Sequence, residues 1–208
     1  MAERTLIVEE PAAGVVLVRL NRPDRLNALS AELMTALEEL WGRLRGRADV
    51  RCVVLTGNGR GFCSGADAGF LAADRAPRGD GLDGELSFVP GRLLDVPVVV
   101  AVNGVCAGGG LHFVADADIV IAAENATFLD PHVSVGQVSG IEPPSLALRL
   151  PLPVIARMAL MGRGERLTAL RLYELGLVTE LVEPGRLVDR AVEIARVIAA
   201  ASPAAVRA

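Results

Sequence analysis

The sequence contains no lysine, and all 21 of its basic residues are arginine. Without a lysine amine, the protein cannot form a Schiff base with a carbonyl substrate. A phosphate-binding P-loop is excluded for the same reason, because that motif requires a lysine after its glycines. The formal net charge of −4 gives no general electrostatic reason to expect a nucleic-acid partner. We interpret the arginine bias as compositional.

Cysteines are few, and long apolar runs are missing. The chain has three cysteines, Cys52, Cys63 and Cys106, and this odd number does not fit a disulfide framework. Free thiols fit a reducing compartment, and we expect Cys63 and Cys106 to be buried small hydrophobic residues. Although 51% of the residues are hydrophobic, charges or glycines interrupt each run before it reaches membrane-spanning length. Residues 1–5 do not resemble a signal peptide, so we expect a cytoplasmic protein without a membrane partner.

The apolar pattern predicts an α/β fold. Strands are expected where β-branched residues cluster, at residues 15–20, 52–56, 98–102, 119–122, 126–128 and 178–182. Ser30 is a suitable N-cap for a first helix. Further helices are expected at residues 111–117, 146–150, 154–161, 168–175 and 187–198. Residues 68–92, rich in Gly, Asp, Pro and Arg, predict a mobile loop.

Two glycine-bearing stretches follow strands and carry the strongest functional signal. They are residues 57–67, which end in Gly-Ala-Asp, and residues 101–110, which end in Gly-Gly-Gly. A strand that ends in glycines can bring bare backbone N–H groups close to a ligand. Two such groups aimed at one point form an oxyanion hole. Either stretch alone could be a structural turn, but the pair favours a functional site.

Other interpretations of these stretches fit poorly. Gly57, Gly59 and Gly61 do not have the spacing of a dinucleotide-binding fingerprint, and the residues after them are a poor helix start. Ser64 lacks the flanking glycines of a nucleophile elbow. The stretches instead resemble those of the enoyl-CoA hydratase/isomerase (crotonase) superfamily, through Ala66-Asp67 after Gly65 and through Asn103-Gly104 before the glycine triplet.

This resemblance covers residues 6–207 and implies a superhelix of stacked ββα units. We therefore expect a single crotonase-like domain over residues 1–208, with a core at about 6–182 and a C-terminal helical part at about 183–208. Family members usually continue into further C-terminal helices, which are expected to be shortened here. The resemblance further implies an acyl-CoA substrate, fatty acid metabolism, a homotrimer or hexamer, and no cofactor apart from the coenzyme A of the substrate.

The resemblance also assigns roles to individual residues. The N–H groups of Ala66 and Gly109 would hold the thioester oxygen. Arg25, Ala66, Asp67 and Gly108 would contact the substrate, with Arg25 near coenzyme A. Because lysine is missing, a coenzyme A phosphate would have to be met by arginine or by backbone. Arg25 could instead be a solvated surface residue, and Asp67 could be a turn residue.

The chain's two histidines occupy the positions of the family's two catalytic glutamates. His112 lies two residues after the glycine triplet, and His132 follows a predicted strand and a proline. Imidazole can transfer protons near neutral pH, but it usually needs a partner that fixes its tautomer. Glu142 is the first candidate partner, and Asp130 is the second. Glu142 could instead cap the following helix.

The resemblance implies an enzyme that stabilises a thioester enolate, and hydratase-like lyase chemistry is our leading expectation. A histidine with a carboxylate is also similar to the family's C–C bond hydrolases. In these enzymes a histidine activates water and a β-diketone is cleaved. A third possibility is a module that binds acyl-CoA without converting it. A metal site is a further alternative, but the two histidines lack the short spacing that is typical of metal ligands, so we predict none.

Overall fold

The computed structural model describes residues 5–67 and 86–206, with the backbone alone at Arg92. Within these residues a larger sheet has six strands, in the spatial order β1–β2–β3–β5–β7–β10. The strands β1 and β2 are antiparallel, and the others pair in parallel. The strand bounds are β1 Leu6–Ala12, β2 Val15–Leu20, β3 Cys52–Gly57, β5 Val98–Val102, β7 Ile119–Ala123 and β10 Glu180–Val182.

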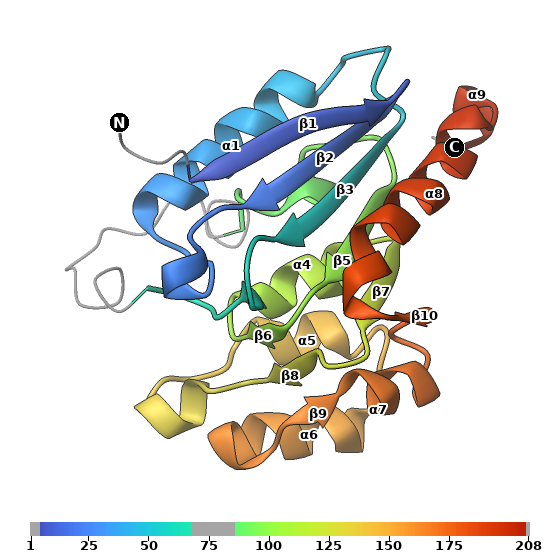
Figure 1. Cartoon of the computed structure of the whole chain (residues 1–208). Helices are drawn as coiled ribbons and strands as arrows, with labels where there is room; N and C mark the ends of the chain where they lie inside the picture. The colour runs from blue at the N-terminus through green and yellow to red at the C-terminus, as the bar shows by residue number, and fades with distance from the viewer. Residues whose placement is uncertain (1–4, 68–85, 207–208) are drawn as a thin grey trace.

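A smaller sheet lies beside the larger one. Its described strands have the order β4–β6–β8–β9, with bounds β4 Gly61–Cys63, β6 Val105–Ala107, β8 Thr127–Leu129 and β9 Leu167–Thr168. The chain passes from β3 to β4, from β5 to β6 and from β7 to β8, so it alternates between the sheets (Figure 1). This alternation gives the α/β superhelix of repeated turns that the resemblance implies.

Helices cover both sheets. The described α-helices are α1 Ala31–Leu44, α4 Gly110–Asp116, α5 Glu142–Leu146, α6 Leu152–Met161, α7 Ala169–Glu174, α8 Leu187–Ala200 and α9 Pro203–Val206. Short 3₁₀ helices are η1 Pro23–Arg25, η2 Pro90–Arg92, η3 His132–Val135, η4 Gly162–Gly164 and η5 Pro184–Arg186. In these ranges no helix has the length and apolar character needed to cross a membrane.

Alternation along the strands divides the core between two faces of the larger sheet. Val16 and Val18 belong to the cluster that includes the buried face of α1. Val15 and Leu17 belong to the cluster that includes the buried face of α8. Successive strand residues point to opposite faces, so the two helices cover opposite sides of the sheet (Figure 1). The predicted N-cap is confirmed, because the Ser30 side chain accepts a hydrogen bond at the start of α1.

The predicted strands are confirmed to within two residues, whereas one helix prediction is wrong. The helix expected at residues 146–150 lies instead at Glu142–Leu146. Pro143 and Pro144 follow Glu142, so this helix has two prolines in its first turn. Prolines are tolerated in a first helical turn, where the N–H groups have no partner within the helix.

The predicted loop at residues 68–92 is wrong over its last part. Residues 68–85 lie outside the described residues, but residues 86–92 are packed rather than mobile. Leu86, Phe88 and Val89 are buried, and η2 follows them. Trp41 Nε1 of α1 donates a hydrogen bond of 2.8 Å to the carbonyl oxygen of Phe88. These apolar side chains anchor the segment beneath α1.

The predicted burial of Cys63 and Cys106 is confirmed, and Cys52 is buried as well. All three thiols are buried and free. Burial raises the pKa of Cys52 and of Cys63 to about 12, and it raises the pKa of Cys106 well above its usual value. Thiols of this kind stay protonated at neutral pH and are poor nucleophiles. They therefore act as small core residues.

Candidate active site

In the first glycine stretch, the backbone N–H of Ala66 has no hydrogen-bond acceptor among the described residues. Leu29 N donates to Gly65 O at 2.8 Å, and Asp67 N donates to Leu29 O at 2.9 Å. These two hydrogen bonds form an isolated parallel β-bridge between Leu29 and Ala66. They involve the carbonyl of Gly65 and the N–H of Asp67, and not the N–H of Ala66. Within residues 5–67 and 86–206, nothing accepts a hydrogen bond from Ala66 N. The bridge therefore fixes a donor that remains available.

The second glycine stretch brings a similar donor to the same place. Gly109 is the N-cap of α4, and its N–H also has no acceptor among the residues that the structure describes. A Cβ built on Gly109 would lie 3.9 Å from Ala66 N. A Cβ built on Gly65 would lie 3.3 Å from Gly109 N. The structure thus brings together the two residues expected to donate to a thioester oxygen.

A strained loop supports the Ala66 segment. Leu26 and Asn27 both have positive φ values, 49° and 55°, which non-glycine residues rarely adopt. Asn27 is fully buried; its Oδ1 accepts from Arg22 N, and its Nδ2 donates to the carbonyl oxygens of Asn58 and Gly61. These three hydrogen bonds hold the loop in its strained conformation against the glycine stretch.

Arg22 is a residue of this region that the sequence analysis missed. Its Nη2 lies 2.9 Å from Asp67 Oδ2, and its Nη1 donates to the carbonyl oxygen of Ala28. Asp67 is therefore held by a guanidinium directly after Ala66. Arg25 is exposed on η1, and no side-chain contact to the two histidines is found for it in the described part of the chain. The substrate-binding roles of Asp67 and Arg25 stay predictions.

The two histidines approach the glycine segment from different elements. His112 lies on α4 and is 7% exposed, and His132 begins η3 just after β8. A Cβ built on Gly108 would lie 3.6 Å from His132 Cε1, so the His132 ring borders the segment that precedes Gly109. Gly108 has φ +48°, a conformation suited to glycine.

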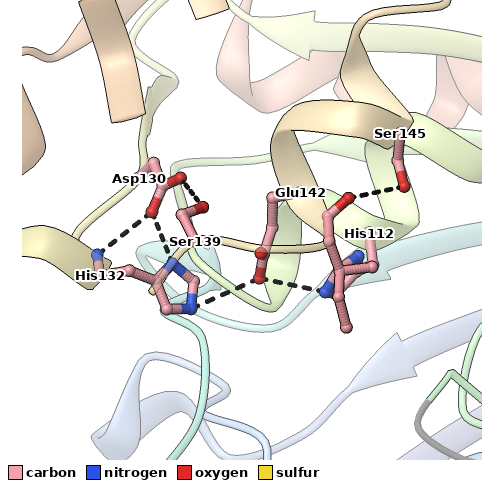
Figure 2. Close-up of polar contacts among 7 residues, drawn as sticks. His112, Asp130, His132, Ser139, Glu142 and Ser145 are labelled. Carbon is pink, nitrogen blue, oxygen red and sulfur yellow. Dashed lines mark hydrogen bonds and ion pairs between the residues drawn. The ribbon is translucent and has the colours of Figure 1, made fainter. Parts of the chain in front are cut away.

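Asp130 is the nearest partner of His132 (Figure 2). Asp130 Oδ1 lies 2.5 Å from His132 Nδ1 and accepts from the His132 backbone N–H at 3.1 Å. Ser139 Oγ donates to Asp130 Oδ2. Burial alone would raise the pKa of Asp130, but the hydrogen bonds from His132 and Ser139 outweigh burial, so this pKa is lowered. Asp130 is therefore a carboxylate that holds one ring nitrogen of His132.

Glu142 lies between the two histidines. Its Oε1 is 3.1 Å from His112 Nε2 and 3.5 Å from His132 Nε2 (Figure 2). Burial would raise the pKa of Glu142, but the hydrogen bond from His112 and the charges of both imidazoles lower it. The pKa of His132 is raised, mainly by its hydrogen bond with Asp130; burial opposes this shift and the charge of Glu142 adds to it.

The structure therefore brings together the three residues expected to be catalytic, but with a different pairing. Glu142 was the first expected partner of His132, whereas Asp130 lies closer to His132 and Glu142 lies closer to His112. In the described ranges no three His, Cys, Asp or Glu side chains are arranged to hold a metal ion. A cavity of about 180 Å³ borders His112 on the side of Leu86, Val89, Ala115, Asp116, Ser145 and Leu148.

Comparison with known proteins identifies the family of this site. Residues 10–208 match the family model described as enoyl-CoA hydratase/isomerase. The chain belongs to this family. It is an acyl-CoA enzyme of the enoyl-CoA hydratase/isomerase type, and its α/β superhelix is the crotonase fold.

Individual relatives of the family show the same likeness. A mevalonyl-coenzyme A hydratase from Aspergillus fumigatus is 36% identical over 208 residues, covering 97% of this chain and 75% of the relative. A 1,2-epoxyphenylacetyl-CoA isomerase from Escherichia coli is 35% identical over 203 residues, covering 93% of this chain and 76% of the relative. The crystal structure of an enoyl-CoA hydratase/isomerase from Mycobacterium paratuberculosis is 42% identical, with a TM-score of 0.90 and coverage of 98% and 79%.

Proposed function

We propose that this protein is a lyase that adds water to the double bond of an α,β-unsaturated acyl-CoA, with His132 as the general base. The observation that carries this proposal is the position of His132. Its ring borders the glycine segment that leads to Gly109, while its Nδ1 is held by the buried carboxylate of Asp130. A base with one nitrogen fixed, and with its ring beside the segment that leads to a backbone donor, suits proton transfer next to a polarised carbonyl.

The proposed reaction balances without an added cofactor. His132 Nε2 removes a proton from water, the resulting hydroxide forms a bond to Cβ, and the electrons of the double bond move onto the thioester oxygen. The N–H groups of Ala66 and Gly109 stabilise this enolate. A proton then passes to Cα as the thioester carbonyl reforms. We propose that one of the two imidazoles, His132 or His112, gives this proton to Cα. Both rings lie close to Glu142 Oε1.

Coenzyme A enters this proposal only as part of the substrate. We expect the thioester at the paired N–H groups and a small acyl group toward the cavity beside His112. That cavity, at about 180 Å³, is smaller than the pockets that usually hold whole drug-sized ligands. Fatty acid metabolism, a cytoplasmic location and a homotrimer or hexamer stay predictions from the family resemblance.

Hydrolysis of a C–C bond in a β-diketone is the second candidate, favoured by the contact between Asp130 and His132. A histidine held by a carboxylate can activate water for attack on a ketone carbonyl. The bond between that carbonyl carbon and the α-carbon would then break, and the leaving fragment would depart as an enolate at the paired N–H groups. Protonation of the fragment by the His132 imidazolium would restore the neutral base.

Incubation with a panel of enoyl-CoAs and β-diketones, followed by mass spectrometry, separates these candidates. Gain of one water without cleavage supports hydration. Gain of water with division into two fragments supports C–C hydrolysis. Migration of the double bond without a change in mass, seen by chromatography, would replace both with isomerase chemistry. Binding of acyl-CoA without any conversion would contradict the proposed activity.

A further inference from the structure

A second hydrogen bond fixes the carboxylate that holds His132. Asp130 is fully buried at the end of β8, and each of its oxygens has a different partner. Oδ1 meets the ring and the backbone N–H of His132, and Oδ2 accepts from the hydroxyl of Ser139 (Figure 2). Ser139 is half-buried in the segment between η3 and α5. Its hydroxyl hydrogen-bonds to Asp130 rather than to the histidine ring.

We propose that Ser139 is a positioning residue, which holds Asp130 so that His132 keeps Nδ1 protonated and presents Nε2 to the reacting atoms. This proposal rests on the proposed function, because it assumes that His132 transfers the proton. A carboxylate bound through one oxygen can rotate and share its charge between both oxygens. A donor on the second oxygen restricts that rotation, and it also satisfies a buried oxygen that would otherwise lack a partner.

The charges around His132 make the effect of Ser139 measurable. Asp130, directly after β8, and Glu142, at the start of α5, are charged groups that act on the imidazole. On α6, which packs against η3, Arg157 is paired with Glu165 at 3.0 Å. Loss of the Ser139 hydroxyl would leave Asp130 less well satisfied. The carboxylate would then retain the imidazolium more strongly, so the midpoint of His132 titration should move to higher pH.

The experiment compares the Ser139→Ala and Ser139→Thr variants, since threonine retains a hydroxyl. Ser134→Ala is the matched control. Ser134 lies on η3 beside His132, but its Oγ accepts from Arg163 N at 2.8 Å rather than contacting Asp130. Because the chain has two histidines, labelling with histidine that carries ¹⁵N at the two ring nitrogens gives an NMR spectrum of two imidazoles alone. Titration of each variant without substrate then reports the His132 tautomer and its pH midpoint directly.

We expect the wild-type protein, Ser139→Thr and Ser134→Ala to show neutral His132 with the proton on Nδ1. Ser139→Ala should show a mixture of tautomers and a titration midpoint at higher pH. Its kcat/KM at neutral pH should fall roughly tenfold, mostly in kcat, because a hydrogen bond to a charged group is lost while substrate contacts remain.

An unchanged tautomer and midpoint in a folded Ser139→Ala variant would overturn the positioning role. The same conclusion would follow if Ser134→Ala produced an equal change, because the effect would then be general loosening of η3. The NMR titration needs no substrate, so it tests Ser139 even if the acyl-CoA panel shows no turnover. Lack of turnover with the expected NMR shift would count against the proposed reaction and leave the contact between Ser139 and Asp130 established.

Discussion

Glu142 Oε1 lies 3.1 Å from Nε2 of His112, although the two residues belong to different helices. The same oxygen is 3.5 Å from Nε2 of His132. One buried carboxylate atom therefore faces both imidazoles.

Replacement of Gly109 by proline should remove one of the two N–H donors that have no acceptor among the described residues. Gly109 has φ −52°, which is close to the value that proline imposes, so the ring is compatible with the local backbone dihedral. We expect kcat/KM on the true substrate to fall by an amount equivalent to about 3 kcal/mol. Steady-state kinetics checks this expectation.

Gly109→Ala is the control for this variant because it keeps the N–H. Its added Cβ would come within 2.8 Å of Leu29 Cδ1, which is the far end of a flexible side chain. Alanine should therefore cost less activity than proline. Equal losses in both variants would assign the effect to crowding by Cβ rather than to the missing donor.

The pH profile of kcat/KM should identify the base. A histidine base is active when neutral, with a reference pKa of about 6.5, whereas a glutamate base stays ionised down to about pH 4 to 5. The pKa of His132 is raised, chiefly by its hydrogen bond with Asp130, so the acid limb should lie above its reference value. Activity should fall as the pH drops through that raised pKa.

Variants of the two histidines sharpen this test. His132→Gln should remove the acid limb together with most of the activity. His112→Gln should cost less if His112 mainly positions the substrate or returns the proton. An acid limb near pH 4 to 5, or one that persists in an active His132→Gln variant, would show that a carboxylate accepts the proton from water.

Folding stability should depend on pH through His132 in a predictable direction. Its folded-state pKa lies above the unfolded value, so its contribution to stability is fully present below about pH 6.5. That contribution is lost as the pH rises through the raised folded-state pKa. The difference in unfolding free energy between wild type and His132→Gln should therefore be larger near about pH 5.5 than near about pH 8.5. Urea titrations at both pH values measure it, and an equal or reversed difference would refute the shift.

Asn27→Ala should destabilise the protein by about 3 kcal/mol, because it removes three hydrogen bonds between this buried side chain and backbone groups. Asn27 Nδ2 donates to the carbonyl oxygens of Asn58 and Gly61, and both bonds hold the loop against the glycine stretch. Asn58→Ala is a suitable control, since Asn58 Nδ2 donates to the side chain of Asn21. Thermal and urea unfolding of both variants should rank Asn27→Ala as clearly less stable. Equal stability would mean that the strained loop does not depend on this side chain.

Much of the fold could be predicted from the sequence because its signals are local. β-branched runs marked the buried strands β2, β3 and β5, and Ser30 marked the start of α1. The strands β1, β4, β6 and β9 were not predicted, and the last three have only two or three residues each. Such short segments have no periodicity of their own and form through pairing with neighbours.

The sequence by itself determined the family resemblance, the paired glycine stretches and the positions of the two histidines, since these depend on residue type and spacing. Only the tertiary structure decided which carboxylate meets which ring. Asp130 lies two residues before His132 but reaches its Nδ1, whereas Glu142 reaches His112 from another helix. Linear spacing cannot show this pairing, because side-chain direction at the ends of β8 and α5 depends on how the two sheets and their helices pack together.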